Sequence, residues 1–267
     1  MRSCAPRGRY TLGVRATPIV GHGSDAGRVR PLNEDYHRVS RFPLPRGHLL
    51  LYAVADGMGG AAAGEVASKM AVEVLEDAFR RYVEQLAEGV RVVPVGKLID
   101  KALRLANRRI HAAAQSENRR GMGTTLTCAA LLDGKAYVGH VGDSRAYLVR
   151  GGTIYQLTKD HSWVEEQLEK GLLTPAEAED HEWRNLITRV LGTRPQVVPD
   201  LIETDVLPGD VLVLASDGLH GLVKPEEIVT ELGRTRDRQH VVDYLIALAN
   251  ERGGPDNITV VIAELHA

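Results

Sequence analysis

Aspartates stand at the ends of several apolar segments of strand length, and this placement restricts the folds open to the chain. Short apolar runs bounded by turn residues are typical of buried strands. Asp56 directly follows such a run, and Asp143 and Asp217 each follow one after a single small residue. Asp256 precedes the last run, and Asp35 stands at a further strand edge. Strands that bring acids to their ends build a cleft of carboxylates, so we expect these five side chains to share one site.

Such a cluster would repel itself unless cations neutralised it. Oxygen ligands with no cysteine or histidine beside them favour a hard ion, Mg²⁺ or Mn²⁺, over zinc. None of the ten histidines lies in an H-E-x-x-H pattern or directly beside these acids. A single Asp-Gly pair is more often a turn than a ligand, but five such placements in one chain indicate a metal site.

The helical and strand patterns come in blocks along the chain rather than in alternation. The chain looks extended from Tyr10 to His22. Apolar periodicity predicts helices at 63–87, 97–116, 225–232 and 237–251. Short apolar runs and hairpin turns predict strands at 48–55, 124–132, 135–141, 145–149, 153–157, 201–207, 211–215 and 258–265. This order predicts an α+β fold with largely antiparallel sheet.

The chain of 267 residues is expected to form one domain, because acids from both halves are needed for the one site. Residues 1–9 are polar and contain Arg, Gly and Pro, so we expect a flexible tail before a domain at 10–267. Residues 160–191 are charged and helix-prone, and we expect them to be a mobile insertion near the site.

Composition excludes several other classes of function. A net charge of -2 argues against a general attraction to nucleic acid or anionic membranes, and 4% aromatic residues argue against base stacking. No run approaches the roughly 18 apolar residues of a membrane span, and the N-terminus lacks the apolar core of a signal peptide. A cytoplasmic protein is therefore expected, and as a separate expectation we take it to be a monomer. Neither Cys4 nor Cys128 begins a C-x₅-R phosphatase loop, and Cys128 is expected to be buried.

Six motifs occur together in a recognisable order: Ser24-Asp-Ala-Gly-Arg-Val-Arg30-Pro-Leu-Asn-Glu34-Asp35, Asp56-Gly57-Met58-Gly59-Gly60, Gly121-Met-Gly-Thr-Thr125, Gly139-His-Val-Gly-Asp143-Ser-Arg145, Ser216-Asp217-Gly218 and Gly253-Gly-Pro-Asp256-Asn-Ile-Thr259. The series resembles the metal-dependent Ser/Thr protein phosphatases of type 2C (the PPM family). The D-G-M-G-G form is similar to that of the bacterial branch. The resemblance covers nearly the whole chain, from Tyr10 to His266.

The resemblance implies a central sandwich of two antiparallel β-sheets flanked by α-helices, in four αββα layers, with a metal cluster at one end. By position, Asp56 would bridge two Mn²⁺ or Mg²⁺ ions, and Asp217 and Asp256 would complete the shell of one. The carbonyl of Gly57 would bind the other ion. The remaining positions have their own implied roles: Asp35 and Glu34 through waters, Asp143 with Asp217 at a third, weaker ion, and Arg30 on the substrate phosphate.

The implied reaction is hydrolysis of phosphoserine and phosphothreonine esters by a metal-bridging water. The chain departs from the family at Met58, which replaces a histidine proposed as the general acid in eukaryotic members. His161 is a candidate donor, although a packed histidine is the alternative interpretation. Arg145 is expected to form a structural ion pair. Segment 160–191 matches the family's flap beside the active site.

Two other functions stay open: a catalytically dead phosphoprotein-binding module of the same fold, and a metal-dependent hydrolase of small phosphate esters. For the leading function, the resemblance implies phosphoprotein partners, including a Ser/Thr protein kinase and its substrates. It implies neither nucleic acid nor membrane as a partner.

Overall fold

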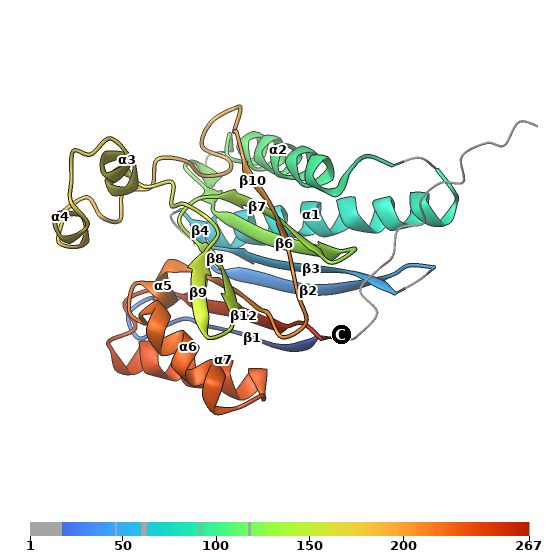
Figure 1. The fold of residues 1–267 in the computed structure, drawn as a ribbon. Helices are drawn as coiled ribbons and strands as arrows, with labels where there is room; N and C mark the ends of the chain where they lie inside the picture. Colours follow the sequence, from blue (N-terminus) through green and yellow to red (C-terminus); the bar gives the residue numbers. More distant parts are fainter. Residues whose placement is uncertain (1–17, 46, 60–62, 91, 117–118, 267) are drawn as a thin grey trace, which may run out of the picture.

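Two five-stranded antiparallel sheets pack face to face, with helices outside each sheet (Figure 1). The computed structural model describes residues 18–45, 47–59, 63–90, 92–116 and 119–266. One sheet has the order β10 (Asp200–Asp205), β7 (Lys135–Val141), β6 (Leu126–Leu132), β3 (His48–Ala55) and β2 (Tyr36–Pro43). The other has the order β1 (Ile19–Asp25), β12 (Ile258–Glu264), β11 (Val211–Ala215), β8 (Arg145–Arg150) and β9 (Thr153–Gln156). A small third sheet pairs β4 (Gly57–Met58) with β5 (Gly123–Thr124).

The helices form the two outer layers and one projecting lobe (Figure 1). The long helices α1 (Ala63–Ala87) and α2 (Val95–Ala113) cover the first sheet, whereas α6 (Pro225–Arg234) and α7 (Arg238–Glu251) cover the second. The one-turn helix α5 (Asp217–His220) follows β11 directly. Two short helices, α3 (Trp163–Glu169) and α4 (Pro175–Glu179), stand out from one end of the sandwich. The expected four-layer α+β sandwich is therefore confirmed.

Burial on both faces explains the continuous apolar sequence of β3. Leu49 and Leu51 face the helices α1 and α2, whereas Leu50, Tyr52 and Val54 face the space between the two sheets. The residues from Leu49 to Ala55 are all buried. A strand covered on both faces needs no polar alternation, so this antiparallel strand has the apolar run more usual in parallel sheets.

Most predicted elements coincide with the observed ones, and the differences have local causes. The helix predicted at 97–116 begins earlier, at Val95 after Pro94, and ends at Ala113; proline suits the start of a helix because it has no N–H to satisfy there. Strand β2 was not predicted, because polar residues interrupt its apolar ones and the strand lies at a sheet edge. The extended segment predicted from Tyr10 is observed only from Ile19, and residues 1–17 lie outside the described residues.

Residues from both ends of the described chain share one sheet. Strand β1 pairs with β12 from Ile19 opposite Glu264 to Asp25 opposite Ile258. This pairing fits the single domain predicted at 10–267, which stays a prediction, as does the tail at 1–9 outside the described residues. Within the ranges that the structure describes, no helix is long and apolar enough to cross a membrane.

Candidate active site

Antiparallel pairing brings Asp35 and Asp56 to the same end of the first sheet. Tyr36, the first residue of β2, lies opposite Ala55, the last residue of β3. Asp35, which precedes Tyr36, and Asp56, which follows Ala55, therefore lie side by side. Asp143 reaches the same end, because β7 ends beside the beginning of β6, which in turn lies beside the end of β3.

The second sheet contributes Asp217 and Asp256 in the same way. The end of β11 pairs with the beginning of β12, with Ala215 opposite Val260. Between the sheets, the Ser216 hydroxyl donates a hydrogen bond of 2.8 Å to Oδ2 of Asp35. The five acids singled out in the sequence thus lie at one end of the sandwich.

The electrostatics show that Asp56 is at the centre of this group. Burial raises the pKa of Asp56 well above its usual value, and the charges of Asp35, Asp217, Asp143 and Asp256 raise it further. All four other acids therefore lie close enough to repel its charge.

The neighbouring acids are perturbed by the same causes. Burial raises the pKa of Asp35 to about 7, although hydrogen bonds from Thr259 and Ser216 oppose the shift. Burial and then the charge of Asp217 raise the pKa of Asp143 to about 8. Burial also raises the pKa of Asp217. Without a counter-charge, this end of the molecule favours protonated acids.

Three of the carboxylates each leave one buried oxygen without any hydrogen-bond partner: Oδ1 of Asp35, Oδ1 of Asp143 and Oδ1 of Asp217. A buried acceptor without a donor is destabilising, and divalent cations bound at this end would supply the missing partners. Among the described residues, no three acid, histidine or cysteine side chains already converge on one point as a complete site. Mg²⁺ keeps several waters and needs only one or two carboxylates, so this all-oxygen set fits such an ion.

Backbone contacts hold Asp56 and Gly57 at the site. The Asp56 N–H donates to the hydroxyl of Thr125 at 2.9 Å, and the Asp56 carbonyl accepts from the Thr124 hydroxyl at 2.8 Å. A Cβ atom added to Gly57 would lie 2.2 Å from the carbonyl oxygen of Gly64, so only glycine allows this approach of β4 to α1. Glu34 meets the same helix end, where its Oε1 accepts from the Gly64 N–H at 3.1 Å.

Arg30 lies at the rim of the acid group. Its Nη2 atom is 2.6 Å from Oδ2 of Asp256, and its side chain is 51% exposed. The hydrogen bond and charge of Asp256 raise its pKa, as do the charges of Asp56 and Asp217. The guanidinium is thus accessible to a ligand and oriented by one of the acids.

Sequence reasoning did not identify three further residues of this end: Ser216, Asn257 and His220. The Asn257 side chain donates to the carbonyls of Ala26 and Leu32 and accepts from the Glu34 N–H, so it ties the loop that carries Arg30 to β12. His220 Nε2 donates to the carbonyl of Asp143 at 3.0 Å. Each stands directly beside one of the acids in the sequence, or within one helical turn of it, and this closeness could have identified them.

Polar contacts fasten the segment 160–191 to the loop that carries Asp143. The His161 N–H donates to the Gly142 carbonyl at 2.7 Å, and Nδ1 of His161 accepts from the Gly142 N–H at 3.0 Å. Arg145 forms an ion pair with Asp160, with an Nη2–Oδ2 distance of 2.7 Å, so the predicted structural ion pair is confirmed.

The candidate proton donor His161 is buried. Its side chain is only 6% exposed, and its Nε2 faces Asp200 at 3.2 Å, which makes it a packed histidine. Met58, which stands at the position of the eukaryotic general-acid histidine, is 37% exposed and has no proton to donate.

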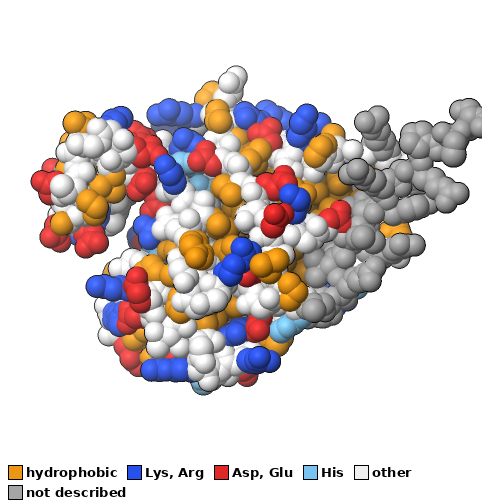
Figure 2. Space-filling view, viewed as in Figure 1, with side chains coloured by type: hydrophobic (Ala, Val, Ile, Leu, Met, Phe, Trp, Pro, Cys, Tyr) orange, Lys and Arg blue, Asp and Glu red, His pale blue; other side chains and the backbone are white. Residues whose placement is uncertain are grey.

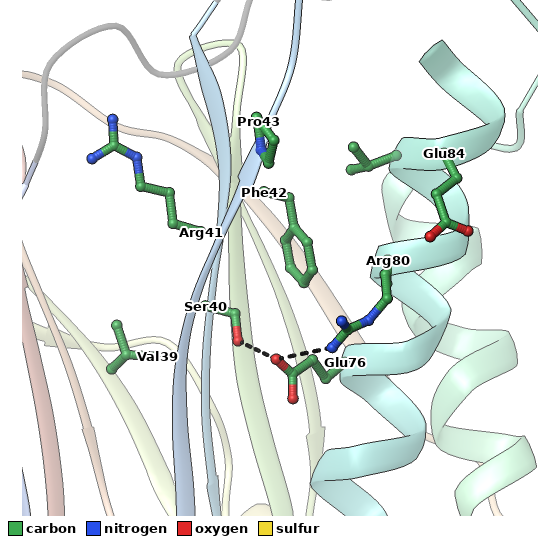
Figure 3. A pocket seen from close by; sticks show the side chains of 9 residues that line it. Val39, Ser40, Arg41, Phe42, Pro43, Glu76, Arg80 and Glu84 are labelled. Atoms are coloured by element: carbon green, nitrogen blue, oxygen red, sulfur yellow. Dashed lines mark hydrogen bonds and ion pairs between the residues drawn. The ribbon is translucent and has the colours of Figure 1, made fainter. Parts of the chain in front are cut away.

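A separate groove lies between the edge strand β2 and helix α1 (Figure 3). Its volume is about 500 Å³, and the side chains of Ser40 and Arg80 point toward Glu76 within it. Phe42 lines the groove seven residues along the chain from Asp35, or roughly 23 Å at the rise of an extended strand. The groove is therefore not part of the acid site.

Comparisons with known proteins agree with this geometry. The family model described as protein phosphatase 2C matches residues 23–255. The protein phosphatase PhpP of Streptococcus pneumoniae is 39% identical over 245 residues, which cover 91% of this chain and 96% of that protein. The structure of the Mycobacterium tuberculosis serine/threonine phosphatase PstP/Ppp superposes with a TM-score of 0.82 at 37% identity, covering 94% of this chain and 99% of that one. The catalytic domain of PstP in complex with two manganese ions gives a TM-score of 0.77 at 35% identity, covering 94% and 100%.

Proposed function

The chain belongs to the protein phosphatase 2C family, and from that premise we propose how its residues carry out the reaction. It is a metal-dependent protein serine/threonine phosphatase of the bacterial type. The observation that carries the proposal for its site is the group of five acids at one end of the sandwich, three of which have an unpartnered buried oxygen.

We propose that Asp56 would help to hold both of two divalent ions, Mn²⁺ or Mg²⁺. Its central position among the acids supports this role. Asp217 and Asp256 would complete the shell of one ion, and the Gly57 carbonyl would bind the other. The remaining acids would have weaker roles: Asp35 and Glu34 through waters, and Asp143 with Asp217 at a third ion. When bound, such ions supply Lewis acidity and lower the pKa of a water beside the phosphorus atom.

Arg30 would bind the phosphate group of the substrate. Its planar fork of donors suits two phosphate oxygens at once, and Asp256 holds the guanidinium at the rim of the acid group. No protein nucleophile is required, which agrees with the absence of a C-x₅-R loop. Both ring nitrogens of His161 face protein groups, so we do not assign it the proton of the leaving alcohol.

The substrates are phosphorylated proteins, and we propose that these include a Ser/Thr protein kinase and its targets. A monomeric state and a cytoplasmic location stay predictions from the sequence. The role of segment 160–191 as a flap over the site is likewise a proposal, supported by its hydrogen bonds to Gly142 beside Asp143.

Phosphate release from a phosphothreonine peptide tests the proposed site. We expect release with Mn²⁺ or Mg²⁺, none in EDTA, and much slower release from Asp56→Asn. Full activity in EDTA would overturn the metal assignment. Peptide binding without release would identify the dead binding module, and faster turnover of a sugar phosphate than of the peptide would identify a small-ester hydrolase.

A further inference from the structure

Both tryptophans of the chain lie in the lobe formed by residues 162–186, which includes α3 and α4 (Figure 1). The ring of Trp163 lies 4.7 Å from that of His181 and 4.7 Å from that of Trp183, which meets it edge-on at 83°. The backbone of Leu186 is tied to both tryptophans, because its carbonyl accepts from the backbone N–H of Trp163 and its N–H donates to the backbone carbonyl of Trp183. We name these four residues the aromatic patch.

The aromatic patch is open to solvent. Trp183 is 47% exposed and Leu186 is 49% exposed. Helix α3 contains no buried residue and α4 contains only one, Ala178, so the lobe has little core for these rings to fill. Tryptophan is highly buried on average, and exposed aromatic side chains that gather in one place are typical of binding surfaces.

The charge around the aromatic patch is strongly acidic. Between Ser162 and Leu186 the sequence has seven acids and two bases, against a net charge of only -2 for the whole chain. Glu165 and Glu182 stand within two residues of the tryptophans, and neither forms an ion pair with any described residue. Burial and then the charges of Asp160 and Glu169 raise the pKa of Glu165, so acids lie close to it. Figure 2 shows hydrophobic and acidic side chains together on this lobe.

The lobe projects from the end of the sandwich that carries the acid site (Figure 1). Trp163 lies two residues after His161, which is hydrogen-bonded to Gly142, the neighbour of Asp143. Two residues of extended chain span roughly 7 Å. A peptide with its phosphate at the acid site beside Asp143 would therefore have flanking residues within reach of the lobe.

We propose that the aromatic patch and its acids bind a cationic side chain, arginine or lysine, that flanks the phosphorylated residue of the substrate. An arginine can stack on an exposed indole face and at the same time pair with a carboxylate. The lobe thereby selects phosphoproteins with a basic flank. This proposal rests on the proposed phosphatase function and adds a class of preferred substrate to it.

Two phosphothreonine peptides that differ only in their flanks, arginine in one and glutamate in the other, test the proposal with the full chain and Mn²⁺. The wild type is expected to have the higher kcat/KM for the arginine peptide. Trp183→Ala should lower kcat/KM for that peptide by about three- to thirtyfold, the scale of a cation–π contact. Glu182→Gln should lower the ratio of kcat/KM for the arginine peptide to that for the glutamate peptide. Added salt should lower this ratio in the wild type, because exposed charges are screened.

Tyr155→Ala is the matched control, since Tyr155 is an aromatic residue 51% exposed on β9, outside the lobe. Its peptide preference should equal that of the wild type. Equal kcat/KM for both peptides in the wild type, or an equal loss for both in Trp183→Ala, would overturn the proposal. Hydrolysis of p-nitrophenyl phosphate in each preparation reports the active site alone, so absence of all turnover in the wild type would count against the phosphatase function instead.

Discussion

The acid end of the sandwich and the lobe at 162–186 are adjacent but are built in opposite ways. The acids stand at the ends of buried strands, and hydrogen bonds between the Asp56 backbone and the hydroxyls of Thr124 and Thr125 hold Asp56 in place. The lobe has almost no buried residue and is fastened through polar contacts at its base. Phosphoryl transfer needs side chains fixed to within about 0.5 Å, whereas recognition of varied peptides tolerates a looser surface. The difference indicates that chemistry and substrate choice are separated in this molecule.

The largest expected effect comes from Asp56→Asn. Phosphatase activity should fall by about 10³-fold or more, the scale of removing one preorganised electrostatic group. The metal-free variant should nevertheless melt at a higher temperature, by about 2–4 °C, because the amide replaces a carboxyl group whose charged form is disfavoured in the folded protein by burial and by its acidic neighbours. Thermal melting in EDTA and phosphate release measure the two effects.

The matched control for this change is Asp205→Asn, an acid that is 79% exposed at the end of β10. It should alter neither activity nor metal-free melting. A lower melting temperature for metal-free Asp56→Asn would contradict the view that the acid end carries unrelieved repulsion.

A pair of leucines tests the contrast in packing. Leu131 is completely buried between the sheets, so Leu131→Ala should lower the free energy of unfolding by about 2–5 kcal/mol. Leu172 is 67% exposed in the lobe, and Leu172→Ala should change it by about 0.5 kcal/mol or less. Urea unfolding measures both, and similar losses would show that the lobe has a core of its own.

Arg30→Lys tests the rim of the acid site. The variant keeps the charge but loses the planar fork, so kcat/KM should fall about ten- to a hundredfold, the scale of one or two hydrogen bonds to a charged group. Arg28→Lys, on the same loop, is the control and should change little. Equal losses of kcat/KM in the two variants would contradict the assignment of phosphate binding to Arg30.

The smallest expected effect concerns pH and His140, which links β7 to the root of the lobe. Its Nε2 donates to the Lys159 carbonyl at 3.0 Å, and burial and then the charge of His161 lower its pKa from 6.5 to about 4. The unfolded chain therefore binds the proton more readily, so stability is full above about pH 6.5 and falls as pH drops toward 4. The loss should be about 1–3 kcal/mol.

Urea unfolding of the wild type and His140→Gln in EDTA across this range measures the effect. The difference between the two proteins isolates His140, since every other titrating group is common to both. An identical pH dependence in the two proteins would show that His140 is not held in its neutral form.

Local patterns predicted the elements that are buried on a whole face. The run at 48–55 and the periodic segment at 63–87 coincide with β3 and α1, because burial of those faces imposes the apolar spacing. The edge strand β2 has no such apolar spacing, since only Ser40 and Phe42 of its eight residues are buried.

The same reasoning holds within the site. Acids at strand ends are visible locally, and so all five could be expected at one end of the fold. The hydroxyl of Ser216 and the amide of Asn257 act on partners 181 and 223 residues away along the chain. Such contacts exist only after the two sheets have packed, so no local pattern predicted them. The tryptophans of the lobe likewise gain a functional interpretation only from their place beside the acid site.

The most direct test is phosphate release from a phosphothreonine peptide after the metal is removed with EDTA and Mn²⁺ is then added back. The wild type should be inactive in EDTA and active again with Mn²⁺, Asp217→Asn should stay inactive, and Asp205→Asn should behave as the wild type. Activity that persists in EDTA, or that is undiminished in Asp217→Asn, would contradict a metal-dependent site at the acid end of the sandwich.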